Sequence, residues 1–172
     1  MDLVINEDNL QYNEVDEFSS KVRAILIDEN NHILVANYNN VYMLPGGKVD
    51  KKETIFEGII RELNEEIGQD YIEDELESFA KLNYFQKSYP KMDGSVKNRL
   101  VQTHFFIGPY KQVNKEKQKL SSSEGKANFK LELLSLDNIE NIVSNNISDN
   151  PRNIYFQKEL LFVIDKYKTI TK

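Results

Sequence analysis

The chain has 172 residues, of which 40% are hydrophobic and 29% are charged, and its formal net charge is −6. This is the composition of an ordinary globular protein that is long enough to bury a substantial core. The sequence contains no cysteine, which excludes disulfides, a cysteine nucleophile and a zinc–thiolate site. The acidic balance argues against an obligate, non-specific nucleic-acid binder, which needs a basic surface.

The N-terminal stretch, residues 1–10, is acidic and lacks the basic and apolar regions of a secretory signal. No apolar run approaches the roughly 18 residues of a membrane span. We therefore expect a cytoplasmic protein without membrane association. We also expect a single domain over residues 1–172, in which residues 1–17 form a loosely ordered segment with a short strand followed by a loop. His32 and His104 are expected as turn or strand residues rather than as metal ligands.

Runs rich in β-branched and aromatic residues predict several strands along the chain. The first two runs are separated by Glu-Asn-Asn, and two later runs are separated by Pro-Lys-Met-Asp-Gly. These turn residues predict two antiparallel hairpins. The strands are expected at residues 21–28, 32–38, 41–44, 79–89, 99–107 and 129–136.

Helical segments lie between and after these strands. Residues 110–125 are rich in Lys and Ser and predict a mobile loop, whereas residues 136–144 predict a short helix. Asn150 and Pro151 predict the start of a longer helix to about residue 168, with Asn150 as the N-cap and Pro151 at the first helical position. Its apolar residues, including Phe156, Leu160 and Val163, are core candidates first. Together these elements predict an α/β sandwich in which a mixed sheet is covered on both faces.

The most informative stretch is the helix expected after Thr54. Thr54 and Glu57 form a capping-box pattern, and Gly68 is placed for a left-handed helix end. With 3.6 residues per turn, the apolar residues of this helix share one face, which must be buried. These residues are Phe56, Ile59, Ile60, Leu63 and Ile67.

The opposite side of this helix carries Glu62, Glu65 and Glu66, close enough to converge on one patch. Like charges at this spacing repel, and Gly58 in mid-helix costs about 1 kcal/mol relative to Ala. The simplest explanation is a bound cation beside the carboxylates and a close approach at Gly58. Clustered oxygen ligands suit a hard divalent cation such as Mg²⁺. The alternative interpretation is a solvated acidic helix face.

The wider spacing favours the functional interpretation. From Gly47 to Gly68 the chain reads G-x5-E-x7-R-E-L-x-E-E-x-G, preceded by Leu-Pro-Gly. This stretch resembles the signature of the Nudix (MutT-type) hydrolases, with all motif carboxylates present. Gln69 departs from the aliphatic residue usual at the next position, which concerns the packing of the helix end rather than chemistry. The resemblance implies a Nudix-like α/β/α sandwich with a mixed central sheet.

The resemblance also implies an activity: Mg²⁺-dependent hydrolysis of a phosphoanhydride (pyrophosphate) bond in a nucleoside diphosphate linked to another group X, with Mn²⁺ as a possible substitute cofactor. The partner would be a small-molecule nucleotide. Carried onto this sequence, Glu62, Glu65 and Glu66 are metal ligands, joined by the backbone carbonyl of Gly46. A nucleotide-sensing module without turnover is the alternative, and a homodimer is left open.

Carried onto the same motif, Arg61 and Glu53 form an ion pair that orients Glu62. The general base stays open. Glu62 and Glu65 are the candidates within the motif, and Glu124 and Glu132 are remote candidates whose alternative is an ordinary surface role.

Substrate contacts lie outside the motif. Arg23, Lys48 and Arg99 are candidates for phosphate binding, against a surface-charge alternative. Asn37 stands where many relatives carry a basic residue, which weakens the case for a simple nucleoside triphosphate. Five aromatic residues can stack on a base or pack within strands: Tyr38, Tyr42, Tyr84, Phe85 and Tyr89.

Overall fold

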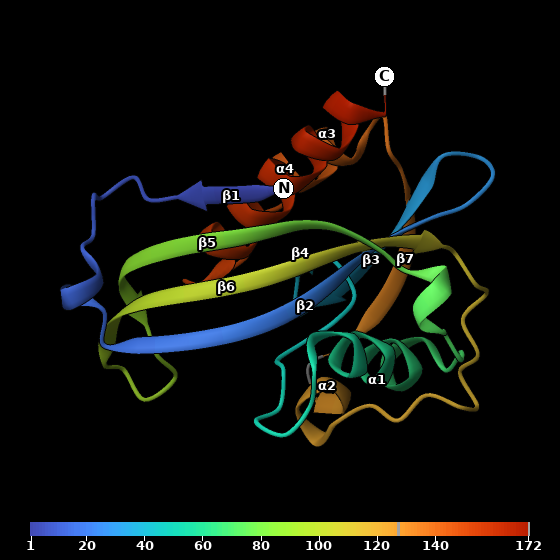
Figure 1. Ribbon diagram of the computed structural model, residues 1–172, viewed down its shortest axis with the longest axis horizontal. Helices are drawn as coiled ribbons and strands as arrows, with labels where there is room; N and C mark the ends of the chain where they lie inside the picture. Colours follow the sequence, from blue (N-terminus) through green and yellow to red (C-terminus); the bar gives the residue numbers. More distant parts are fainter. Residues whose placement is uncertain (127, 172) are drawn as a thin grey trace.

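A computed structural model describes residues 1–126 and 128–171 of the chain. The seven strands of this part form one mixed sheet in the order β1-β5-β6-β2-β3-β4, with β7 paired to β3, and helices lie on both faces of the sheet (Figure 1). The strands are β1 (Asp2–Ile5), β2 (Glu17–Ile27), β3 (His32–Tyr38), β4 (Val41–Met43), β5 (Glu77–Pro90), β6 (Val96–Pro109) and β7 (Lys130–Ser135). The helices are α1 (Ile55–Ile67), α2 (Ser122–Lys126), α3 (Ile139–Ser144) and α4 (Asn153–Ile170), with single 3-10 turns η1 (Tyr12–Glu14) and η2 (Glu73–Glu75).

The sheet confirms the two predicted hairpins, because β2 pairs antiparallel with β3 and β5 pairs antiparallel with β6. The long connections bring parallel neighbours together. β1 runs parallel to β5, and β2 runs parallel to β6 along its whole length, from Glu17↔Arg99 to Ile27↔Pro109. β2 therefore lies at the centre of the sheet. Its residues can reach both the helix that follows β4 and the start of α4.

Two apolar layers sandwich the sheet, as the alternating strand residues require. Ala24 of β2 packs with α1, whereas its neighbour Ile25 packs with α3 and α4 on the opposite face. Leu160 and Val163 of α4 are buried in that second layer, as predicted. The predicted α/β sandwich is thus confirmed.

Local sequence explains α1 well. The Thr54 hydroxyl accepts a hydrogen bond from the Glu57 amide, and the Glu57 carboxylate accepts one from the Thr54 amide. Gly68 ends the helix in the left-handed conformation, with φ of 70°. The predicted apolar face points at the sheet: Ile59, Leu63 and Ile67 are buried, and Phe56 and Ile60 pack against them at the edge.

Two predicted segments differ from the structure. α4 begins at Asn153 rather than at Pro151, because the Asn150 side chain accepts a hydrogen bond from the Arg152 amide and holds a turn before the helix. The segment expected as a loop over residues 110–125 ends in α2, and its middle is tied to the C-terminal end of α1. Gln69 contributes to this tie, since its side-chain amide donates to the Gln112 carbonyl at 2.7 Å.

The N-terminal residues join the sheet through β1, and the amino group of Met1 donates to the Phe79 carbonyl. Among the described helices, none combines the length and apolarity that crossing a membrane would need.

Candidate active site

The turn after β4 lies flat against β2. Val22 and Ala24 donate their amides to the carbonyls of Gly47 and Pro45, both at 2.9 Å. Gly46 has φ of 126°, and a Cβ atom there would lie 2.3 Å from the Val22 carbonyl oxygen. Only glycine fits such a position. The turn is thereby fixed between β2 and the C-terminal half of α1.

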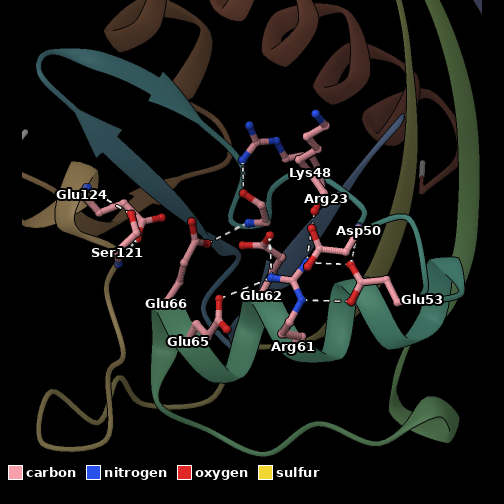
Figure 2. Close-up of polar contacts among 11 residues, drawn as sticks. Arg23, Lys48, Asp50, Glu53, Arg61, Glu62, Glu65, Glu66, Ser121 and Glu124 are labelled. Carbon is pink, nitrogen blue, oxygen red and sulfur yellow. Dashed lines mark hydrogen bonds and ion pairs between the residues drawn. The ribbon is translucent and has the colours of Figure 1, made fainter. Parts of the chain in front are cut away.

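Glu66 reaches this turn from the last turn of α1 (Figure 2). Its Oε2 accepts a hydrogen bond from the Gly46 amide at 2.7 Å, and the residue is 4% exposed. Burial raises the pKa of Glu66 to about 8, although the Arg23 charge and the Gly46 amide act in the opposite direction. A buried carboxylate with so little compensation would be stabilised by a cation.

Glu62, one helical turn earlier, lies against Gly47. A Cβ atom on Gly47 would stand 2.4 to 2.6 Å from the Glu62 carboxylate atoms, so the glycine makes room for this carboxylate. Burial raises the pKa of Glu62, while its bond to Arg61 opposes the shift. Glu62 and Glu66 therefore form a pair of largely buried carboxylates on one side of the turn.

Arg61 holds the neighbouring loop in place (Figure 2). Its guanidinium donates to both carboxylate oxygens of Glu53, at 2.9 and 2.7 Å, and to the Lys48 carbonyl at 3.0 Å. The same group donates to Glu62 Oε1 at 2.9 Å and to Glu65 Oε2 at 3.3 Å. Arg61 thus forms the ion pair with Glu53 that the sequence predicts and also fixes the Glu62 carboxylate. The bonds to Arg61 lower the pKa of Glu53.

Glu65 lies further out than its neighbours. Its side chain is 38% exposed and rests on Arg61. In the part of the chain that the structure describes, no three acidic or histidine side chains are close enough to form a ready-made metal site. The donor chemistry nevertheless fits a hard divalent cation, because the buried groups of Glu62 and Glu66 offer only oxygen.

Gly46 and Arg23 meet beneath the turn. Nη1 of Arg23 donates to the Gly46 carbonyl and, at 2.8 Å, to the Leu44 carbonyl, while Nη2 lies 3.4 Å from the Met43 sulfur. Arg23 is 4% exposed, and its Nε has no hydrogen-bond partner among the described residues. The carbonyl predicted as a metal ligand therefore faces Arg23 in this structure.

Gly58 has a different environment from the one expected. We expected its open position to admit a ligand. A Cβ atom there would instead lie 3.1 Å from Glu53 Oε1 and 3.6 Å from Val49, both within this chain. The close approach at Gly58 is made by the loop that Arg61 holds.

A cavity of about 370 Å³, here named the main cavity, opens beside the turn. It is bounded by Glu66 on one side and by the start of α4 on the other. Its cationic lining residues are Lys21, Arg23, Lys48 and Arg152, and its aromatic ones are Tyr38, Phe129 and Phe156. Of the five aromatic residues that the sequence offered for stacking, Tyr38 lines this cavity. The sequence predicts Phe156 as a core candidate and Phe129 as the start of a strand. For Phe156 the sequence signal is its position four residues after Arg152, which also lines the cavity, and Phe129 has no comparable signal.

The other predicted phosphate-binding and stacking residues are dispersed. Lys48 lines the main cavity together with Arg23, whereas Arg99 and Tyr89 line a separate neighbouring cavity. Tyr84 and Phe85 lie together in a third cavity under the N-terminal segment. Tyr42 packs beside the core next to α4.

The two remote carboxylates occupy different places. Glu124 of α2 lines the main cavity, and its charge contributes to the raised pKa of Glu66. The Glu124 carboxylate also accepts a hydrogen bond from the Ser121 amide at 2.6 Å (Figure 2). Glu132 pairs across the strands with Val35, on the sheet face away from α1, and lies 3.5 Å from the Tyr42 hydroxyl. Only Glu124 of these two is therefore near the α1 carboxylates.

Comparison with known proteins places these observations in context. A profile of the NUDIX domain family matches residues 18–154. No curated protein sequence matches significantly.

Solved structures with the same fold include three that we compare. The NUDIX domain of Shewanella oneidensis NrtR, in complex with ADP ribose, has a TM-score of 0.57 and 13% identity, and the match covers 98% of this chain and 100% of that one. The MutT protein from Methanosarcina mazei Go1 has a TM-score of 0.54 and 18% identity, with 88% and 96% covered. The mutator MutT protein from Bacillus halodurans has a TM-score of 0.53 and 18% identity, with 81% and 80% covered. At these identities the likeness concerns the fold.

Proposed function

We propose that this chain, a pyrophosphohydrolase of the NUDIX domain family, uses Mg²⁺ for its reaction. The bond hydrolysed would be a phosphoanhydride bond in a nucleoside diphosphate linked to another group X. One observation carries this proposal. Two largely buried carboxylates, Glu62 and Glu66, lie against a glycine turn, and Glu66 lines a cavity that also offers cations and aromatic rings.

Glu62 and Glu66 would hold the metal ion, with Glu65 and the Gly46 carbonyl as further candidate ligands. When bound, Mg²⁺ would neutralise charge on the anhydride oxygens and acidify the attacking water. The raised pKa values of Glu62 and Glu66 fit this role, because a neighbouring cation favours the ionised form of a buried acid.

Arg61 and Glu53 would position Glu62 without contacting substrate. The two-pronged Arg61–Glu53 bond fixes the guanidinium plane, and the bond to Oε1 then sets the orientation of the Glu62 carboxylate. A lysine at position 61 would keep the charge but could not make this set of bonds.

For the general base we favour Glu124 over Glu132 among the remote candidates, because Glu124 shares the cavity with Glu66. Its carboxylate would take the proton from the attacking water. Glu62 and Glu65 are the competing candidates within the motif. Comparing kcat for Glu124→Gln and Glu132→Gln tests the choice: a loss of orders of magnitude in Glu124→Gln alone supports Glu124 as the base, and wild-type kcat in Glu124→Gln contradicts it.

The rest of the cavity suits a nucleotide. Phe129 and Phe156 offer faces on which a base would stack, and Lys48 offers a charge for phosphate oxygens. Arg23 is committed to the turn carbonyls, so its role would be to hold the turn and to lend positive charge.

The experiment that tests the proposal is a screen of nucleotide pyrophosphates with Mg²⁺, in which products are identified by mass. ADP-ribose is a first substrate to include, because a NUDIX domain of the same fold is known in complex with it. Metal-dependent release of a nucleoside monophosphate would support the proposal. Nucleotide binding without turnover in any member of the screen would favour a sensing module instead.

A further inference from the structure

Arg99 is a buried cation with an unpaired donor. The residue lies on β6 and is 8% exposed, yet its Nε has no hydrogen-bond partner within residues 1–126 and 128–171. This Nε forms a long ion pair with Glu17 Oε1 at 3.7 Å, which is beyond hydrogen-bond distance. The guanidinium carbon lies 4.0 Å from the centroid of the Tyr89 ring, so the group is stacked and held in place. A buried guanidinium with an unpaired donor is costly, and a bound anion would offset that cost.

The guanidinium faces a cavity. Arg99 lines a space of about 330 Å³ together with Tyr89, Lys91, Met92, Asp93 and Arg152. Met92 and Arg152 also line the main cavity beside Glu66, so the two cavities adjoin. A ligand in the main cavity could therefore extend past Arg152 towards Arg99.

Positive charge is concentrated along this path. Lys21, Arg23 and Arg99 occupy odd-numbered positions of β2 and β6 on the sheet face that packs against α4. Burial, together with the charges of Arg23, Arg99 and Arg152, lowers the pKa of Lys21 to about 8 against the opposing charge of Glu159. Arg152 itself is held by one weak bond, from its Nε to Asn150 Oδ1 at 3.3 Å.

The nearby carboxylates are already engaged. Glu17 accepts a hydrogen bond from the Lys91 ammonium at 2.6 Å, and Asp93 accepts hydrogen bonds from both the amide and the hydroxyl of Ser95. Glu159 accepts the Thr103 hydroxyl at 3.2 Å. Among the described residues, the carboxylate that faces Arg99 is thus shared with Lys91, so that two cations compete for Glu17.

The spacing indicates which part of a ligand would lie here. Arg99 pairs with Glu17, whereas the Gly46–Gly47 turn is bonded to Val22, five residues further along β2. At about 3.3 Å per residue this places the backbone of Arg99 about 16 Å from the glycine turn, measured along the strand. A group bound at Arg99 is therefore remote from the bond that is hydrolysed.

We propose that Arg99 and Arg152 bind a second phosphate of the substrate, a phosphomonoester outside the hydrolysed anhydride. This inference rests on the proposed function and narrows its substrate class to nucleoside diphosphate derivatives that carry such a phosphate. Two arginines suit a phosphate dianion better than a single carboxylate, because each guanidinium can offer two parallel donors to its oxygens.

The first test needs no catalysis. Metal-free protein in EDTA is titrated with inorganic phosphate at constant ionic strength, with chloride as the reference, and Tm is followed. We expect phosphate to raise Tm of the wild-type protein, and Arg99→Gln and Arg152→Gln to weaken its apparent affinity about tenfold or more. Lys97→Gln removes an exposed charge from the same strand as Arg99 and should behave as wild type. Equal phosphate responses in wild type and both arginine variants would overturn the proposal. Arg152 is less buried than Arg99, so Arg152→Gln keeps the test valid if Arg99→Gln fails to fold.

The second test uses substrate pairs that differ by one phosphate: ADP-ribose with its 2′-phosphate, and dephospho-coenzyme A with coenzyme A. We expect kcat/KM to favour the phosphorylated member of at least one pair by about tenfold or more, and Arg99→Gln to abolish that preference. Phosphate binding without a preference in either pair would mean that the site takes free phosphate only, and the substrate assignment would be wrong. If no pyrophosphate is turned over at all, the proposed function fails, and the Tm titration alone decides on the Arg99 site.

Discussion

Replacing the two adjacent glycines of the turn by alanine should separate the fold from the chemistry. At Gly47 the added Cβ would lie 2.4 Å from the Glu62 carboxylate, about 1 Å closer than an ordinary contact of 3.4 Å. The carboxylate ends a flexible side chain and can retreat. Displacement of a reacting group by about 1 Å can cost about 100-fold in rate. We therefore expect Gly47→Ala to lower kcat about 100-fold while costing only about 1 kcal/mol of stability.

At Gly46 the Cβ would instead meet the Val22 carbonyl at 2.3 Å, in a backbone conformation with φ of 126°. Backbone cannot retreat as a side chain can, so Gly46→Ala should cost roughly 2–4 kcal/mol of stability. Gly125→Ala is the matched control, because its Cβ would meet nothing within 4 Å.

The assay is thermal unfolding combined with kcat and KM on the nucleotide that the screen identifies. Gly47→Ala with wild-type kcat would refute the placement of Glu62 in the reaction. Gly47→Ala that unfolds as readily as Gly46→Ala would refute the distinction between the two positions.

Further predictions concern the carboxylates and their partner. Glu62→Gln and Glu66→Gln should each lower kcat by orders of magnitude while the fold is kept, because a neutral amide is a poor ligand for a hard divalent cation; wild-type turnover in both would refute the metal assignment. Arg61→Lys should lower Tm by several degrees, about 1–2 kcal/mol, and reduce kcat more than it raises KM, because the bonds to Glu53 and Glu62 are lost. Burial raises the pKa of Glu66 from 4.5 to about 8, so between these pH values the unfolded chain releases a proton that the folded metal-free protein keeps. Stability should therefore fall as pH rises from about 4.5 to about 8 and level off above, and chemical denaturation should show a flatter profile in Glu66→Gln.

The elements governed by local sequence could be predicted. The cap of α1 depends on Thr54, Glu57 and Gly68, which are all near one another in the chain, and the structure has this cap. The ion pair of Arg61 with Glu53 also forms within one loop and helix. The hairpins followed from turn residues between apolar runs.

The features that depend on distant segments could not be predicted. Whether Glu124 or Glu132 approaches α1 depends on how β7 pairs with β3, which only the three-dimensional register fixes. Within its helix Phe156 has the pattern of a core residue. It lines the cavity instead, because the start of α4 lies close to β4 and the glycine turn. The glycine at position 58 predicted a helix face open to a ligand. In the structure Glu53 and Val49 of the preceding loop lie against this face.

The central claim is that Glu62 and Glu66 bind a divalent cation that drives the reaction. Isothermal titration of Mg²⁺ into the protein, alone and with a non-hydrolysed nucleotide analogue, tests it most directly. We predict saturable uptake in the wild type that is lost in Glu62→Gln and Glu66→Gln and kept in Glu132→Gln. The absence of uptake with or without nucleotide, or equal uptake in all four proteins, would contradict it.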